Sequence, residues 1–127
     1  KNLISELQIT ETVEMTGFTD NPYPAVKNAD FYILSSRYEG FPTVLFEAVT
    51  LKKNIIATEV SGVREILENG KLGLIVENSE EGIYEGMKKA LTHPESFDAY
   101  AETLKTYSMP FTLENSVNSI VQIIDDL

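Results

Sequence analysis

Two glutamates around a glycine-containing loop are the residues of this sequence best suited to chemistry. Glu39 and Glu47 are separated by seven residues, and the segment between them begins Gly-Phe-Pro. Gly40 lets backbone approach a ligand closely, and Pro42 suits the first turn of a helix. The N–H groups that open this helix would attract an anion such as phosphate, namely those of Thr43, Val44 and Leu45. Because carboxylates accept hydrogen bonds from hydroxyls, the combination predicts a receptor for a nucleotide sugar.

A purely structural explanation of these residues stays open at this point. Glu39 could be a solvated loop residue, and Glu47, one turn into the helix, could do no more than favour the helix dipole. Paired carboxylates also serve glycoside hydrolysis, although a phosphate-binding helix on a parallel sheet fits that reaction less well. A second loop contains Ser61 and Gly62, where the glycine could simply make the turn from strand to helix. Arg37 would matter only if a phosphate lay close to it.

The elements that would position these residues alternate between strands and helices. Four short runs are expected to be strands: Val13–Gly17, Phe31–Ser35, Asn54–Thr58 and Gly73–Val76. The second and third are nearly continuously apolar, which is typical of strands covered by helices on both faces. Apolar spacing indicates helices near residues 43–51, 64–68, 79–92 and 96–107, and a last helix over residues 112–127. Ser79 is the expected N-cap of the third, because Glu80 and Glu81 follow it in the first turn, and Pro24–Asn28 is expected to hold a short helical turn. This order predicts an α/β fold with a parallel sheet, whose ligands bind beyond the carboxyl ends of the strands.

Composition excludes several classes of protein. The chain has 127 residues, which fits one domain, and 20 acidic against 10 basic residues. A net charge of −10 argues against a protein whose surface binds nucleic acid. With no cysteine and one histidine, the chain can form no disulfide, no cysteine-based metal site and no multi-histidine metal site. No apolar run approaches the ~20 residues of a membrane span. Because residue 1 is lysine, we expect that the chain was processed or cut from something longer.

Three segments of the sequence together resemble the GT-B retaining glycosyltransferases of family 4. They read NADFYILSSRYEGFPTVLFEA, NIIATEVSGVREIL and NGKLGLIVE, and the two glutamates match that family's E-x7-E element. The resemblance covers about Val13 to Glu77, and it is specific because the three pieces occur in the right order at the right strand–helix positions. It implies a parallel Rossmann-like sheet of about four strands with flanking helices, which would be an incomplete GT-B C-terminal domain.

The resemblance also implies roles for individual residues. Glu39 would contact hydroxyls of the donor sugar near the reacting anomeric face, which makes it the candidate catalytic residue, and Glu47 would hold the ribose hydroxyls. Backbone amides would hold the sugar and the diphosphate, at Gly40, Phe41, Thr43 and Val44. The base would be bordered by Gly17 and Phe18, and the weaker candidates are Ser61, Gly62 and Arg37. In this family the departing nucleoside diphosphate is stabilised without a metal, so the resemblance implies no metal and no cofactor.

The chain departs from that family in its sheet. A Rossmann sheet of this kind has roughly six strands in the order 3-2-1-4-5-6, and the four runs here would be strands three to six. Val13–Gly17 would then lack its neighbours, so the segment would detach, pair differently or associate through an exposed edge with a second chain. The acceptor-binding N-terminal domain would be missing, and the last helix, residues 112–127, would pack back on this domain or on the missing one.

Three functions follow from these observations. The favoured one is the donor-binding part of a retaining glycosyltransferase, whose parent would transfer a hexose to a glycan or lipid-linked acceptor, as in polysaccharide biosynthesis. The chain by itself would be inactive. The alternatives are a nucleotide-sugar epimerase-like GT-B enzyme and a non-catalytic α/β interaction module. The expected location is the cytoplasm, with the parent peripheral at the inner membrane face, and nucleic acid is not an expected partner.

Overall fold

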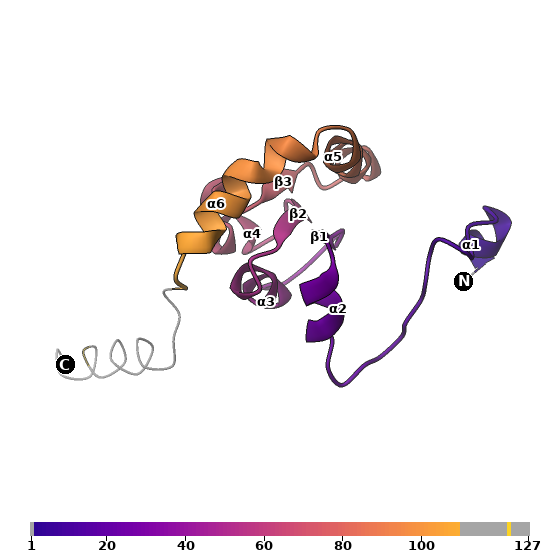
Figure 1. Cartoon of the computed structure of the whole chain (residues 1–127), viewed down its shortest axis with the longest axis horizontal. Coiled ribbons are helices and arrows are strands. Elements are labelled where there is room, and N and C mark those ends of the chain that lie inside the picture. Colours follow the sequence, from indigo (N-terminus) through magenta and orange to yellow (C-terminus); the bar gives the residue numbers. More distant parts are fainter. Residues whose placement is uncertain (1, 110–121, 123–127) are drawn as a thin grey trace.

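Three parallel strands form the centre of the computed structural model, which describes residues 2–109 and 122 (Figure 1). The sheet has the order β1-β2-β3, with bounds β1 (Phe31–Leu34), β2 (Asn54–Thr58) and β3 (Leu74–Val76). Both pairings are parallel, with Phe31 opposite Asn54 and Ile56 opposite Leu74. Three of the four expected strands are therefore confirmed, and their carboxyl ends lie at one edge of the sheet.

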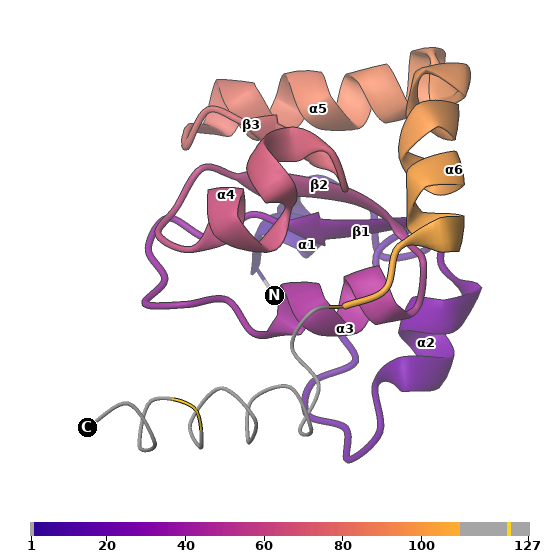
Figure 2. The same ribbon diagram turned by 90° about the vertical axis from the view of Figure 1, so that its left-hand side faces the viewer.

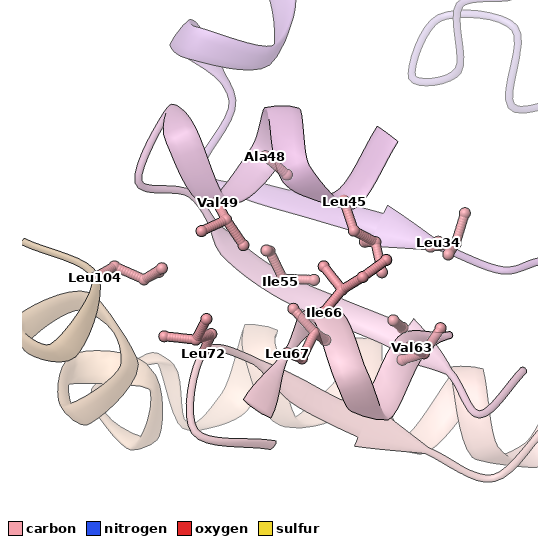
Figure 3. Close-up of a cluster of buried hydrophobic side chains, with 11 residues drawn as sticks. Leu34, Leu45, Ala48, Val49, Ile55, Val63, Ile66, Leu67, Leu72 and Leu104 are labelled. Atoms are coloured by element: carbon pink, nitrogen blue, oxygen red, sulfur yellow. The ribbon is translucent and has the colours of Figure 1, made fainter. Parts of the chain in front are cut away.

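The central strand β2 sends alternate side chains into two separate buried clusters. Ile55 and Ala57 face α3 (Val44–Thr50) and α4 (Val63–Ile66), in a cluster that Figure 3 shows around Ile55. Ile56 faces the other way and packs with Ala90 and Phe97. Both faces of the strand are buried, which explains why its sequence is apolar at consecutive positions.

Helix α5 (Glu80–Thr92) covers the face of the sheet opposite α3 (Figure 2). Its expected N-cap is confirmed, because the Ser79 side chain accepts a hydrogen bond of 3.0 Å from the Gly82 N–H. The expected helix near residues 96–107 is also present, but it begins as a short 3-10 turn and continues as a regular helix. These segments are η2 (Pro94–Phe97) and α6 (Asp98–Thr106), while η1 (Glu68–Gly70) precedes β3.

The expected strand Val13–Gly17 is absent from the sheet, and this corrects the prediction of about four strands. The segment belongs to residues 2–21, here called the N-terminal arm, which carries α1 (Asn2–Glu6) and stands apart from the sheet in Figure 1. A strand needs a hydrogen-bonded neighbour, and within the described part of the chain β1 pairs only with β2. The N–H of Val13 bonds instead to the Ile9 carbonyl at 3.0 Å, in a local turn.

The remaining elements connect the arm to the sheet and end the described chain. Helix α2 (Tyr23–Asn28) lies directly before β1, where a short helical turn was expected. The expected helix over residues 112–127 lies outside the described residues. Within residues 2–109 and 122, no helix combines the length and the apolar character needed to cross a bilayer.

Candidate functional site

The loop between β1 and α3, residues 35–43, carries Glu39 at the carboxyl edge of the sheet. Glu39 is half-buried, and its Oε1 accepts a hydrogen bond of 2.6 Å from the Ser36 hydroxyl. The hydroxyl of Thr58, the last residue of β2, lies 2.6 Å from the Ser36 carbonyl oxygen. Glu39 is therefore attached to the sheet through Ser36 and is not simply a solvated loop residue.

Glu47 and Glu39 both act electrostatically on the Tyr32 phenol. Glu47 sits in the first turn of α3 and is half-buried, and Tyr32 is part of β1. Burial raises the pKa of the Tyr32 phenol, and the negative charges of Glu47 and then Glu39 raise this pKa further. Because such an effect falls off with distance, both carboxylates lie near one aromatic side chain. The structure thus brings together the two glutamates that the sequence singled out.

The N-terminus of α3 offers fewer free amides than the sequence suggested. The N–H of Thr43 bonds to the Phe41 carbonyl at 2.9 Å, and the N–H of Leu45 bonds to the Pro42 carbonyl at 3.0 Å. These two amides are therefore engaged in the turn that begins the helix, and this corrects the expectation of three free groups. The N–H of Val44 has no acceptor within the described residues. Beside it, Gly40 faces open space, since an added Cβ would meet no atom within 4 Å.

The second loop supports the first through Gly62. This residue has φ +81°, and an added Cβ would lie 2.5 Å from the Phe41 ring and 3.2 Å from Pro42. The glycine therefore makes the strand-to-helix turn and also admits the side chains of the Glu39 loop. Its neighbour Ser61 is exposed. Sequence reasoning identified the turn but missed the contact, because nothing local in either loop indicates that they touch.

A cleft of about 560 Å³, lined mainly by residues with polar side chains, opens on the α5 side of the carboxyl edge. Arg37 is one of its lining residues and forms an exposed ion pair of 2.6 Å with Glu80 in the first turn of α5. The Asn78 side chain donates a hydrogen bond of 2.8 Å to the Arg37 carbonyl oxygen. Sequence reasoning missed Asn78 and Thr58. Two features of the sequence could have pointed to them: Asn78 directly precedes the N-cap of α5, and Thr58 is a hydroxyl residue at the end of an apolar strand.

The structure does not bring Gly17 and Phe18 to this site. Both lie in the exposed N-terminal arm, where Phe18 is 92% exposed and a Cβ on Gly17 would meet no atom within 4 Å. As for metal binding, no group of three or more acidic, histidine or cysteine side chains within the described chain could hold an ion. The candidate site consists of the Glu39 loop, the start of α3 and the Gly62 loop.

Together these features define a Rossmann-like α/β domain with a candidate ligand site at the carboxyl edge of its sheet. The chain belongs to the family described as glycosyl transferases group 1, whose model matches residues 1–106. The solved structure of sucrose-phosphate synthase from Thermosynechococcus elongatus has the same fold, with a TM-score of 0.75 over 98% of this chain and 32% of that chain at 21% identity. The expected GT-B architecture is therefore confirmed, with three strands.

Two curated relatives indicate the range of the family. N-acetylgalactosamine-N,N'-diacetylbacillosaminyl-diphospho-undecaprenol 4-alpha-N-acetylgalactosaminyltransferase of Campylobacter jejuni is 33% identical over 111 residues, covering 86% of this chain and 30% of that protein. Poly(glycerol-phosphate) alpha-glucosyltransferase of Bacillus subtilis is 27% identical over 131 aligned positions, covering 98% of this chain and 20% of that protein. The chain thus spans less than a third of the length of both relatives.

Proposed function

We propose that this chain is the donor-binding part of a retaining glycosyltransferase, whose parent transfers a hexose to a glycan or lipid-linked acceptor. The observation that carries the proposal is the half-buried Glu39 carboxylate, which Ser36 and Thr58 attach to the carboxyl edge of the sheet in the loop that leads into α3, where Glu47 lies in the first turn. Two carboxylates beside an open glycine can accept hydrogen bonds from the vicinal hydroxyls of a sugar and a ribose. Membership of the group 1 family supports a nucleotide sugar as the donor.

In this proposal each candidate residue has a separate task. Glu39 contacts the donor sugar next to the anomeric carbon, and Glu47 holds the ribose hydroxyls. The loop residues Gly40 and Phe41 line the sugar and the diphosphate, and the free Val44 amide faces a phosphate oxygen. Thr43 contributes by shaping the helix start, because its own N–H is already bonded. Supporting positions are Ser61, Gly62 and Arg37 beside this loop.

The proposed reaction exchanges one bond at the anomeric carbon for another on the same face of the sugar. The bond to the diphosphate oxygen breaks and its electron pair leaves with the nucleoside diphosphate. The acceptor hydroxyl attacks from the face that the diphosphate leaves, forms the new glycosidic bond and passes its proton to the departing diphosphate oxygen, and the anomeric configuration is retained because both bonds lie on the same face. No metal or cofactor takes part in this scheme.

We further propose that residues 1–127 are one partial domain of a longer cytoplasmic enzyme that is peripheral at the inner membrane face. The acceptor would bind to an N-terminal domain. The chain alone would then transfer no sugar, because the reaction needs both halves of the cleft. The outer edge of β1 is unpaired within the described residues, and it could pair with a second chain when this chain is isolated.

Titration of the isotopically labelled chain tests donor binding directly. The probes are uridine diphosphate glucose, guanosine diphosphate mannose and adenosine diphosphate glucose, and the readout is the amide spectrum of residues 40–47. We expect one of them to shift these resonances and Glu47→Gln to weaken the effect. Glu81→Gln is the matched control, because Glu81 is also an acid in the first turn of a helix but lies on α5. Absence of shifts with every probe would refute the proposal.

The longer protein provides a second test. Its products distinguish a new glycoside from an epimerised nucleotide sugar, which is the outcome expected of an epimerase-like enzyme. Donor binding without any product would favour the non-catalytic module.

A further inference from the structure

We propose that Thr58 and Asn78 are positioning residues, which hold the loop of Glu39 by two consecutive carbonyl groups and so set its carboxylate for the donor. The inference rests on the proposed function for its purpose, but the contacts on which it stands do not involve a ligand. Thr58 ends β2, and Asn78 lies between β3 and α5. Neither residue has a task in the proposed binding of the donor, and neither was suggested by the glutamate motif.

Thr58 extends the pairing of β1 and β2 beyond the last backbone pair. That pair is Leu34 opposite Ala57, and the side chain of the next residue of β2 reaches the carbonyl groups at the end of β1 and in the loop that follows it. The Thr58 hydroxyl lies 3.3 Å from the Leu34 carbonyl oxygen and 2.6 Å from that of Ser36. Thr58 is only 3% exposed, so water does not compete effectively for this hydroxyl, and the shorter contact fixes the Ser36 peptide.

Ser36 connects the Thr58 hydroxyl to the carboxylate of Glu39. Its own hydroxyl donates to Glu39 Oε1 at 2.6 Å, a hydrogen bond to a charged acceptor. Ser36 therefore accepts a hydrogen bond from Thr58 at its carbonyl oxygen and donates one to Glu39 from its side chain. The orientation of the Glu39 carboxylate depends through this chain of contacts on the buried hydroxyl of Thr58.

Asn78 fixes the next peptide along the loop from the other side. Its Nδ2 donates to the Arg37 carbonyl oxygen at 2.8 Å, while the Arg37 guanidinium pairs with Glu80 at 2.6 Å. The carbonyls of Ser36 and Arg37 are thus anchored to two different elements, the end of β2 and the connection before α5. Two successive restraints determine the path of the chain more strictly than either would alone. Beyond them the loop is open, with Tyr38 87% exposed.

Such anchoring matters because a binding carboxylate must be held to within about 0.5 Å of its productive position. Losing one hydrogen bond of ordinary net strength would weaken donor binding by about threefold to tenfold. A purely structural role predicts a different pattern. If Thr58 only fills space, Thr58→Val is harmless and Thr58→Ser leaves a small gap. If its hydroxyl positions the loop, Thr58→Val disturbs the loop and weakens donor binding, while Thr58→Ser keeps the wild-type loop and affinity.

The test compares the wild-type chain with Thr58→Val, Thr58→Ser, Asn78→Ala and the control Thr103→Val, which removes a hydroxyl that also bonds to a carbonyl oxygen but lies on α6. The first readout needs no ligand and consists of the amide resonances and hydrogen exchange of residues 36–40. We expect Thr58→Val and Asn78→Ala to shift these resonances and accelerate exchange, while Thr58→Ser and the control match the wild type. Asn78 is exposed, so Asn78→Ala keeps the test valid even if Thr58→Val fails to fold.

The second readout is the affinity for whichever of the three donor probes the wild type binds. We expect donor affinity to fall by about threefold to tenfold in Thr58→Val and Asn78→Ala only. Unchanged loop spectra in both variants would overturn the positioning role, whatever the donor does. Altered loop spectra with unchanged affinity would overturn it as well, since the loop would then move without consequence. If the wild type binds no probe, the proposed function fails, and the ligand-free spectra still decide whether Thr58 and Asn78 hold the loop.

Discussion

Replacing Gly62 by alanine would test how closely the two loops at the carboxyl edge fit together. Gly62 has φ +81°, and its added Cβ would lie 2.5 Å from Cδ2 of the Phe41 ring and 3.2 Å from Cδ of Pro42. Carbon atoms in favourable contact are about 3.5–4.0 Å apart, so the ring must move by roughly 1 Å. Phe41 follows Gly40 in the Glu39 loop, and its displacement would therefore disturb the candidate site as well as the fold.

Two separate costs add up in this variant. The left-handed backbone conformation costs an alanine about 1–2 kcal/mol. Forcing extra volume into a packed contact costs a further 1–3 kcal/mol or so. Phe41 is 44% exposed, which allows its ring to swing partly into solvent, so we expect the lower part of that second range. The total loss of unfolding free energy is then about 2–3 kcal/mol, a large share of the ~5–15 kcal/mol of a typical domain.

Gly70→Ala separates the two costs because it carries only the first. Gly70 has φ +90°, yet an added Cβ there would meet no atom within 4 Å. Urea unfolding should therefore show Gly62→Ala to be less stable than Gly70→Ala by about 1 kcal/mol or more. In a Phe41→Ala background the closest contact is gone and only Pro42 remains near, at 3.2 Å, so the cost of Gly62→Ala should then approach that of Gly70→Ala.

Equal losses for Gly62→Ala and Gly70→Ala in the wild-type background would refute this reasoning. The cost at Gly62 would then come entirely from its backbone conformation, and the contact with Phe41 would carry no energy. The same result would remove Gly62 from the candidate site, since its place there rests on close contact with Phe41 and Pro42 of the Glu39 loop.

Two further predictions concern a helix end and a buried phenol. Ser79→Ala removes the cap of α5, and we expect it to cost about 1 kcal/mol in urea unfolding; a cost near zero would contradict the cap. Burial and the hydrogen-bonded carboxylate of Glu68 raise the pKa of Tyr107 to about 12. Because this pKa lies above the ordinary value near 10, the protonated phenol stabilises the fold below pH ~10, and that contribution is lost as the pH rises toward 12. Tyr107→Phe should abolish the latest phase of the ultraviolet phenol titration, and a phase that persists would assign it elsewhere.

Local patterns in the sequence were sufficient to predict elements that are stabilised by contacts within the element or by burial of a whole apolar face. Ser79 followed by two acidic residues predicted the start of α5, because a capping hydroxyl needs only the N–H groups of the next turn. The apolar run of β2 predicted a strand buried on both sides, because both neighbouring clusters require apolar residues there. The pair of Glu39 and Glu47 was also found from spacing alone.

Patterns failed where an element depends on a partner far away in the chain. Val13–Gly17 has an acceptable strand sequence, but a strand forms only with a neighbour, and the described residues provide none. Two of the three amides expected to be free at α3 are bonded, because the turn before the helix supplies its own acceptors in Phe41 and Pro42. A local sequence gives no information about such geometry.

By itself, the sequence determined the type of fold, the order of its elements and the two glutamates on which the proposed chemistry rests. Periodicity and capping are encoded in neighbouring residues, so they can be read without coordinates. Only the tertiary structure decided that Phe41 rests on Gly62, and that Thr58 and Asn78 hold the carbonyls of the Glu39 loop. Those contacts join residues about 20 to 40 positions apart, and their geometry exists only after the parallel strands have brought their carboxyl ends to one edge.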